Sequence, residues 1–128
     1  MDCEFIRSKD KEMLGRISLV NYNGQTIFDT VVQPEEQVTD YITHITGLTK
    51  ESFINAPAFK EVNDHVISLI RDKIVVGHTL KCDFEKLTSN EEMSITYIDV
   101  SEHKEFMRDS FKKSKLKDLS SIHLNAKI

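Results

Sequence analysis

Three acidic residues have the types and the spacing for metal chemistry. Asp2 and Glu4 are separated by one residue, and Asp83 follows a Gly77-His78 pair much further along the chain. Side chains at positions i and i+2 of a strand share a face, about 6–7 Å apart along the backbone. Neighbouring carboxylates repel unless a cation lies between them, and hard oxygen ligands suit Mg²⁺ or Mn²⁺. The spacing therefore indicates metal-dependent chemistry on phosphate.

Such chemistry needs carboxylates that converge from different elements. Two divalent ions about 3.5–4 Å apart can hold the attacking water and the leaving oxygen of a phosphodiester in line. Asp2 and Glu4 lie on the expected first strand and Asp83 at the start of a helix, so three acids could hold one ion well and a second loosely. Singly, Asp2 reads as a solvated acid and Asp83 as a helix cap or first-turn residue. The ordered combination favours the metal site.

The composition is that of one globular domain. The chain has 128 residues, 39% of them hydrophobic and 30% charged, with a net charge of −4. This balance argues against tight non-specific binding of nucleic acid, although bound metal ions would give a nuclease local positive charge. No apolar run approaches the ~18 residues of a membrane span, and no signal peptide is recognisable. We expect an intracellular protein with no membrane partner.

The two cysteines, Cys3 and Cys82, form no C-x-x-C pair, which argues against a structural zinc site. Strand alternation places Cys3 on the face opposite Asp2 and Glu4. We therefore expect it to be a free thiol that points into the core.

The elements that must position the acids follow from hydrophobic periodicity. Strands are expected at 2–6, 14–22 and 25–33, with a two-residue hairpin turn at Asn23-Gly24 in which both residues have positive φ. After a loop with helical turns, the pattern predicts a helix from Ala58, a buried strand at 73–77, a helix at 80–87, a strand at 95–100 and helix over 101–128. The order βββ-α-β-α-β-α predicts an α/β domain, a mixed sheet with helices on its faces.

Several stretches together resemble one known family. They are residues 1–5, 14–18, 21–24, 38–49, 55–57 and 76–83, with a weaker match at 97–100 and 114–124. The chain is similar to the DEDDh group of 3′→5′ exonucleases, which have the ribonuclease H-like fold. It is most similar to the RNA exonuclease 4 branch, which includes the interferon-stimulated 20 kDa exonuclease. The resemblance implies three antiparallel strands followed by parallel strands, flanked by helices.

The resemblance also implies roles for individual positions. Asp2, Glu4 and Asp83 would be catalytic metal ligands for Mg²⁺ or Mn²⁺, at a site that takes two ions in the complete family. The substrate would be the 3′ end of RNA, or of single-stranded DNA. The residues implied in substrate binding are the main-chain groups of Cys3 and Phe5, near the 3′-terminal hydroxyl, and the side chains of His44, Ile45 and Leu48. The sequence alone favours loop packing over a nucleotide contact for Ile45 and Leu48.

The third motif of that family, His-x4-Asp, is not found beyond Asp83. Only His78 and Asp83 have this spacing, and they belong to the second motif. The missing histidine would be the general base, and the missing aspartate the fourth metal ligand. We expect the single domain 1–128 to be C-terminally incomplete, either a fragment or a shortened natural form. His123 is a weak alternative base, because it belongs to the last expected helix.

These observations leave three functions open. The first is a metal-dependent 3′→5′ exonuclease domain that is weak or inactive as this chain, because loss of a general base removes about 10²–10⁴-fold of rate. The second is a non-catalytic module of the same fold that binds nucleic acid or protein. The third is a self-associating chain, since a missing helix would expose core surface. Nuclear or nucleolar localisation is implied by the resemblance only.

Overall fold

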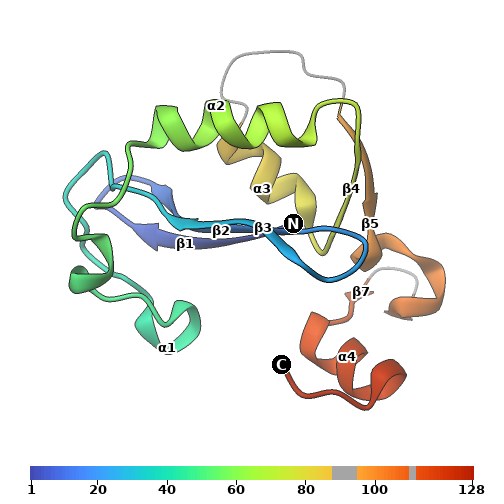
Figure 1. The fold of residues 1–128 in the computed structure, drawn as a ribbon. Helices are drawn as coiled ribbons and strands as arrows, with labels where there is room; N and C mark the ends of the chain where they lie inside the picture. Colours follow the sequence, from blue (N-terminus) through green and yellow to red (C-terminus); the bar gives the residue numbers. More distant parts are fainter. Residues whose placement is uncertain (88–94, 110–111) are drawn as a thin grey trace.

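A three-stranded antiparallel sheet forms the first part of the computed structural model, which describes residues 1–87, 95–109 and 112–128 (Figure 1). The order is β1-β2-β3, and its strands are β1 (Asp2–Arg7), β2 (Glu12–Val20) and β3 (Thr26–Val31). Alternate residues of β2 are buried, which is the period expected of a sheet with one face against a core. The three expected strands are confirmed, with ends shifted by up to two residues.

The turn between β2 and β3 differs from the expectation. Of its residues only Gly24 has positive φ, at 77°, and Gly24 N–H donates to Asn21 O at 2.9 Å. The Asn21 side-chain Oδ1 accepts from the backbone N–H groups of Asn23 and Gln25. This is a longer hairpin loop with glycine at its left-handed position, so the two-residue turn was wrong. The asparagine side chain stabilises the longer loop because it satisfies two backbone donors.

The second part of the fold is a helix, a strand, a helix and a strand. These are α2 (Phe59–Ile70), β4 (Ile74–Gly77), α3 (Leu80–Leu87) and β5 (Thr96–Asp99), and β4 pairs with β5 in parallel. Both helices cover the same face of the three-stranded sheet (Figure 1). Their apolar sides meet that sheet in one core of ten buried residues: Leu14, Ile17, Leu19, Val32, Val62, Val66, Ile70, Val75, Leu80 and Leu87. Helices with a 3.6-residue period and strands with a two-residue period thus bury their apolar sides in one core. The α/β fold class is confirmed.

β1 and β4 meet only at the start of β1. The Met1 ammonium donates to Val76 O at 2.7 Å, while β1–β3 and β4–β5 otherwise form separate sheets. Gly77 makes this approach possible. A Cβ on Gly77 would lie 2.7 Å from Met1 O and would also collide with the Leu80 side chain. A glycine at the end of β4 therefore brings β1 and α3 together.

The segment after β5 is not the continuous helix that the sequence predicted. It forms short 3-10 turns at Val100–Glu102 and Lys104–Phe106, then a two-stranded pairing of β6 (Met107–Asp109) with β7 (Lys112–Lys113). Among the described residues of this segment, only α4 (Leu116–Leu124) is α-helical. Phe106 and Met107 are adjacent in sequence, so they cannot line one side of a helix as residues three or four apart do. The expectation was wrong for the described residues 101–109 and 112–115, because the apolar period begins only at Leu116.

No α-helix in the described ranges is long and apolar enough to cross a membrane.

Candidate metal and nucleotide site

β1 carries the first two candidate ligands on one face. In the β1–β2 register Asp2 pairs with Ser18 and Glu4 with Arg16, and the register shifts immediately after Glu4. Such bulges occur often beside functional sites, because they re-aim the strand. Asp2 is exposed and Glu4 half-buried. Burial raises the pKa of Glu4, Asp2 raises it further, and Arg16 opposes both.

Cys3 lies on the opposite face of β1, as predicted. It is a free thiol that packs against the main core. Burial raises the pKa of this thiol well above its usual range, and the negative charges of Asp83 and Asp2 add to the effect. Cys3 is therefore a neutral thiol beside the acids rather than a thiolate ligand.

Asp83 lies in the first turn of α3, and only 5% of its surface is exposed. Desolvation by burial raises its pKa to about 7, and Asp2, Asp99 and Glu4 raise it as well, while the Met1 ammonium opposes them. No described side chain or backbone group donates a hydrogen bond to the Asp83 carboxylate. An acid buried without donors among other acids is a group that a cation would stabilise.

The structure brings the three acids into one electrostatic cluster but not into a finished ligand set. Within 1–87, 95–109 and 112–128, no three His, Cys, Asp or Glu side chains are arranged to hold a metal ion. Asp2 and Glu4 leave one face of β1, and Asp83 approaches from α3. The donor set still fits a hard divalent cation, because it consists of carboxylates whose mutual repulsion is only partly offset by Arg16 and the Met1 ammonium. Asp2, Glu4 and Asp83 would hold such an ion.

Asp99 was not singled out as a site residue from the sequence, although it meets the same cluster. It ends β5, where its Oδ1 accepts from Thr79 N–H and Ser101 N–H, both at 2.9 Å, and its Oδ2 accepts from Leu80 N–H at 3.0 Å. Desolvation would raise the pKa of Asp99, but these hydrogen bonds outweigh it and the pKa is lowered. Both oxygens are used by the backbone, so Asp99 is a structural cap of α3 and thereby positions Asp83. The available signal was an aspartate at the end of a parallel strand, where such sites gather.

Replacing Asp99 by alanine should cost about 2–3 kcal/mol of unfolding free energy, since three backbone donors lose a charged acceptor. Urea unfolding followed by circular dichroism measures the change. The slope of the unfolding free energy against urea concentration should be the same for the variant and wild type. Asp10→Ala is the matched control, because Asp10 is exposed in a turn and makes no side-chain hydrogen bond. Equal stability of the two variants would contradict the capping role.

His78 anchors the turn before α3. Its Nε2 lies 2.9 Å from Ser114 O and its Nδ1 3.1 Å from Thr79 Oγ1. A carbonyl can only accept, so Nε2 carries the proton and Nδ1 accepts from the threonine hydroxyl. The turn is conformationally demanding, since Thr79 has φ of 64°, a left-handed value that is rare for a β-branched residue.

The loop expected to contact the terminal nucleotide contains the short helix α1 (Thr43–Thr46), followed by Gly47 at φ of 70°. His44 is exposed, and Ile45 has 71% of its surface in solvent. Leu48 is instead buried in a second core with Ile6, Met13 and Phe53. Leu48 thus has the packing role that the sequence favoured, and a nucleotide contact by Ile45 or His44 stays a prediction.

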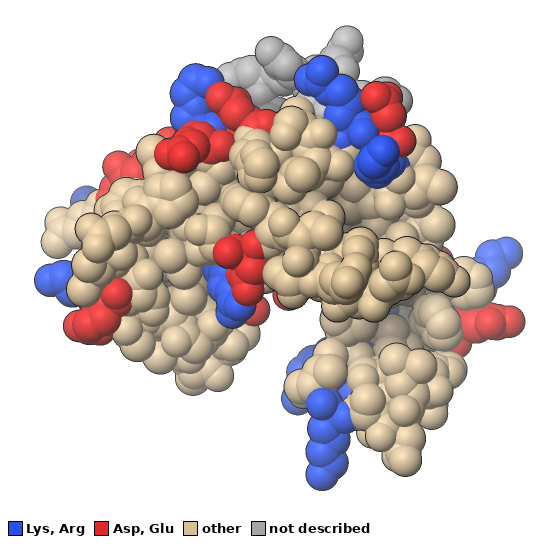
Figure 2. All heavy atoms as spheres, in the orientation of Figure 1, with Lys and Arg blue, Asp and Glu red and all other residues tan. Residues whose placement is uncertain are grey.

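Positive charge does not gather into a stripe on the face drawn in Figure 2. Lys and Arg side chains of the described residues lie there in separate patches, most of them next to acidic ones. This distribution agrees with the low non-specific affinity for nucleic acid that the net charge of −4 suggests.

Comparison with known proteins gives consistent matches. The family model described as Exonuclease matches residues 1–124. RNA exonuclease 4 of Candida glabrata is 38% identical, over all of this chain and 50% of that protein. The interferon-stimulated gene 20 kDa protein of Mus musculus is 38% identical, over 73% of this chain and 31% of that protein. This chain thus spans half or less of the length of these relatives.

Solved structures give the same fold. The Pan2 catalytic unit of Neurospora crassa, which contains protease and nuclease domains, superposes with a TM-score of 0.80 over 99% of this chain and 22% of that one, at 25% identity. The Saccharomyces cerevisiae Pan2 module in complex with AAUUAA RNA superposes with a TM-score of 0.77, over 99% of this chain and 24% of that one, at 20% identity.

Proposed function

Because this chain belongs to the exonuclease family, we propose that it forms the metal-binding part of a 3′→5′ exonuclease site acting on the 3′ ends of RNA. The observation that carries the proposal is the cluster of acids. Arg16 is the cation that lowers the pKa of Glu4, and Asp83 is buried beside Asp2 and Glu4, which raise its pKa. Relatives named RNA exonuclease 4 support RNA as the substrate class.

The chain's own residues account for binding and orientation. Asp2, Glu4 and Asp83 would hold Mg²⁺ or Mn²⁺, and a bound ion would supply Lewis-acid stabilisation of charge on the phosphate oxygens. Asp99 holds the start of α3 and so fixes the backbone that carries Asp83. The main chain at Cys3 and Phe5 would lie by the terminal hydroxyl, with the 43–48 loop beside the terminal nucleotide.

A general base is the part for which we find no residue. His-x4-Asp does not occur beyond Asp83, and in the structure His123 contacts Phe106 ring to ring rather than the acids. We therefore expect residues 1–128 to bind metal and RNA ends but to cleave at least 10²-fold more slowly than an enzyme with a base in place.

Calorimetric titration of the chain with Mn²⁺ tests the proposal. Asp2→Ala and Asp83→Ala should lose binding, and Asp10→Ala, a control of equal charge change on an exposed turn, should keep it. Failure of the wild-type chain to bind Mn²⁺ would favour a non-catalytic module instead. Incubation with 5′-labelled single-stranded RNA, and with DNA of the same sequence, measures cleavage. Rapid loss of nucleotides from the 3′ end, abolished by Asp2→Ala, would contradict the expected low rate.

Two further expectations stay predictions. Self-association is one, motivated by Ile74, Val76 and Ile98, which lie on one side of the β4–β5 pair and are 63%, 49% and 53% exposed. Nuclear or nucleolar localisation is the other.

A further inference from the structure

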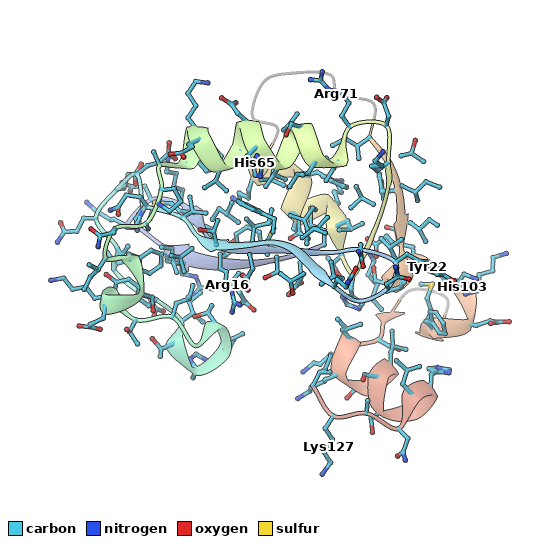
Figure 3. The ribbon with its side chains drawn as sticks, in the orientation of Figure 1. Arg16, Tyr22, His65, Arg71, His103 and Lys127 are labelled. Atoms are coloured by element: carbon cyan, nitrogen blue, oxygen red, sulfur yellow. The ribbon has the colours of Figure 1, made fainter. Side chains whose placement is uncertain are left out.

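An arginine lies directly across from one of the proposed metal ligands. Arg16 of β2 is the register partner of Glu4, and Ser18 is the partner of Asp2. Side chains directly opposite in an antiparallel pair share a face, with Cβ atoms about 4.5–5.5 Å apart. Figure 3 shows Arg16 on the side of the sheet away from α2. The Arg16 guanidinium is therefore within reach of Glu4 and Asp2, the carboxylates that would bind a divalent cation.

The guanidinium is nevertheless bound to a third strand. Arg16 Nε donates to Asp29 Oδ1 at 2.8 Å and Nη2 donates to Asp29 Oδ2 at 2.6 Å, a two-pronged pairing. Ser18 Oγ also donates to Asp29 Oδ1, at 2.9 Å. Asp29 belongs to β3 and is the register partner of Ser18. The hydrogen bonds of Arg16 thus go to β3, while Glu4 receives only its electrostatic field.

Removal of Asp29 would change this balance. The freed fork of Arg16 would have Glu4 directly across from it and Asp2 diagonally beyond, and a carboxylate is the partner that its geometry prefers. An Arg16–Glu4 pair would occupy the oxygens that a divalent ion requires. As a mere surface ion pair, in contrast, Arg16–Asp29 would be worth little, because the two side chains are 43% and 34% exposed.

We propose that Asp29 is a positioning residue which holds Arg16 away from Glu4 and Asp2 and so keeps these carboxylates open for a divalent cation. The inference rests on the proposed function, since it concerns the same acids. Asp29 itself stays outside the ligand set. Its role is to remove an internal competitor, and the short hydrogen bond from Ser18 fixes its carboxylate in the orientation that receives the fork.

Mn²⁺ titration of a set of variants tests this role in the 128-residue chain. Asp29→Ala should weaken Mn²⁺ binding about tenfold, the equivalent of one charge-assisted hydrogen bond that must be broken. Arg16→Gln alone should change the affinity by less than about threefold, and adding Arg16→Gln to Asp29→Ala should restore it. Asp64→Ala, which breaks the exposed Lys60–Asp64 pair on α2, is the matched control and should leave the affinity unchanged. Purely long-range charge effects would make the Arg16 and Asp29 changes additive, which would overturn the proposal.

A second measurement needs no metal. A double-mutant cycle of Arg16→Gln and Glu4→Gln on the unfolding equilibrium reports the Arg16–Glu4 coupling, and this coupling should grow at least about threefold when Asp29 is alanine. Equal coupling in both backgrounds would overturn the inference. Failure of wild-type Mn²⁺ binding would instead count against the proposed function, and the cycle would still decide whether Asp29 restrains Arg16.

Discussion

Asp83→Asn is expected to stabilise the metal-free chain by about 1–3 kcal/mol at pH 8 and to abolish its stabilisation by Mn²⁺. Only 5% of the surface of Asp83 is exposed, and its pKa is raised from 3.8 to about 7 by desolvation first and by Asp2, Asp99 and Glu4 in addition. A shift of this size corresponds to at most ~4 kcal/mol. Solvent near the exposed Asp2 screens part of this energy, so the expected gain is the lower figure of about 1–3 kcal/mol.

The sign of the pH dependence follows from proton binding. The folded chain binds the Asp83 proton more tightly than the unfolded chain, so the unfolding free energy falls as pH rises from about 4 to about 7. Below pH 4 the carboxyl is protonated in both states, and Asn offers no advantage there. Chemical unfolding of Asp83→Asn and wild type at pH 4 and pH 8 measures the difference. A gain that is equal at both pH values would contradict an origin in the buried charge.

Mn²⁺ should reverse the order of stability. Ligand at about 1,000 times its dissociation constant adds about 4.1 kcal/mol to a chain that binds it only when folded, which exceeds the advantage of Asp83→Asn of about 1–3 kcal/mol. Wild type should gain this amount and Asp83→Asn should gain none. Asp10→Asn, the exposed control, should respond to Mn²⁺ as wild type does. Retention of the Mn²⁺ effect in Asp83→Asn would show that Asp83 is no ligand, whatever its effect on the metal-free chain.

The second large effect is expected at Gly77. Gly77→Ala should cost about 3 kcal/mol, because overpacking here must displace backbone as well as side chain. The added methyl group would lie 2.7 Å from Met1 O and 2.9 Å from Leu80 Cγ. Met1 directly precedes β1, which carries Asp2 and Glu4, and Leu80 begins α3, which carries Asp83. Such a loss is a large share of the stability of a small domain, so the variant should unfold at much lower urea concentration.

Gly24→Ala is the matched control for this prediction. Gly24 has φ of 77° and open space around its Cα, so only backbone strain opposes the substitution, at about 1 kcal/mol. Mn²⁺ affinity separates the two positions further: Gly77→Ala should weaken it even where the chain is folded, and Gly24→Ala should leave it unchanged. Equal costs for both variants would mean that β1 and α3 can move apart freely.

Much of the fold followed from local patterns. Alternation predicted β1 to β3, the helical spacing of Val62, Val66 and Ile70 predicted α2, and the bounds of α3 were predicted to the residue. The failures share one cause. The hairpin depended on the Asn21 side chain, and the described residues 101–109 and 112–115 depended on non-local contacts, such as Ser114 O with His78. Neither kind of contact leaves a periodic signal.

The sequence by itself predicted Asp2, Glu4 and Asp83 as metal ligands. It also determined that Asp2 and Glu4 share a face and that Cys3 lies on the other, because strand alternation is a local property. The tertiary structure alone decided how strongly Asp83 is desolvated, and that Asp99 caps α3 rather than joining the ligands. It also decided that Arg16, across from Glu4, is bound to Asp29 instead. Burial, strand register and hydrogen-bond choice depend on segments distant in sequence, so no spacing along the chain could have fixed them.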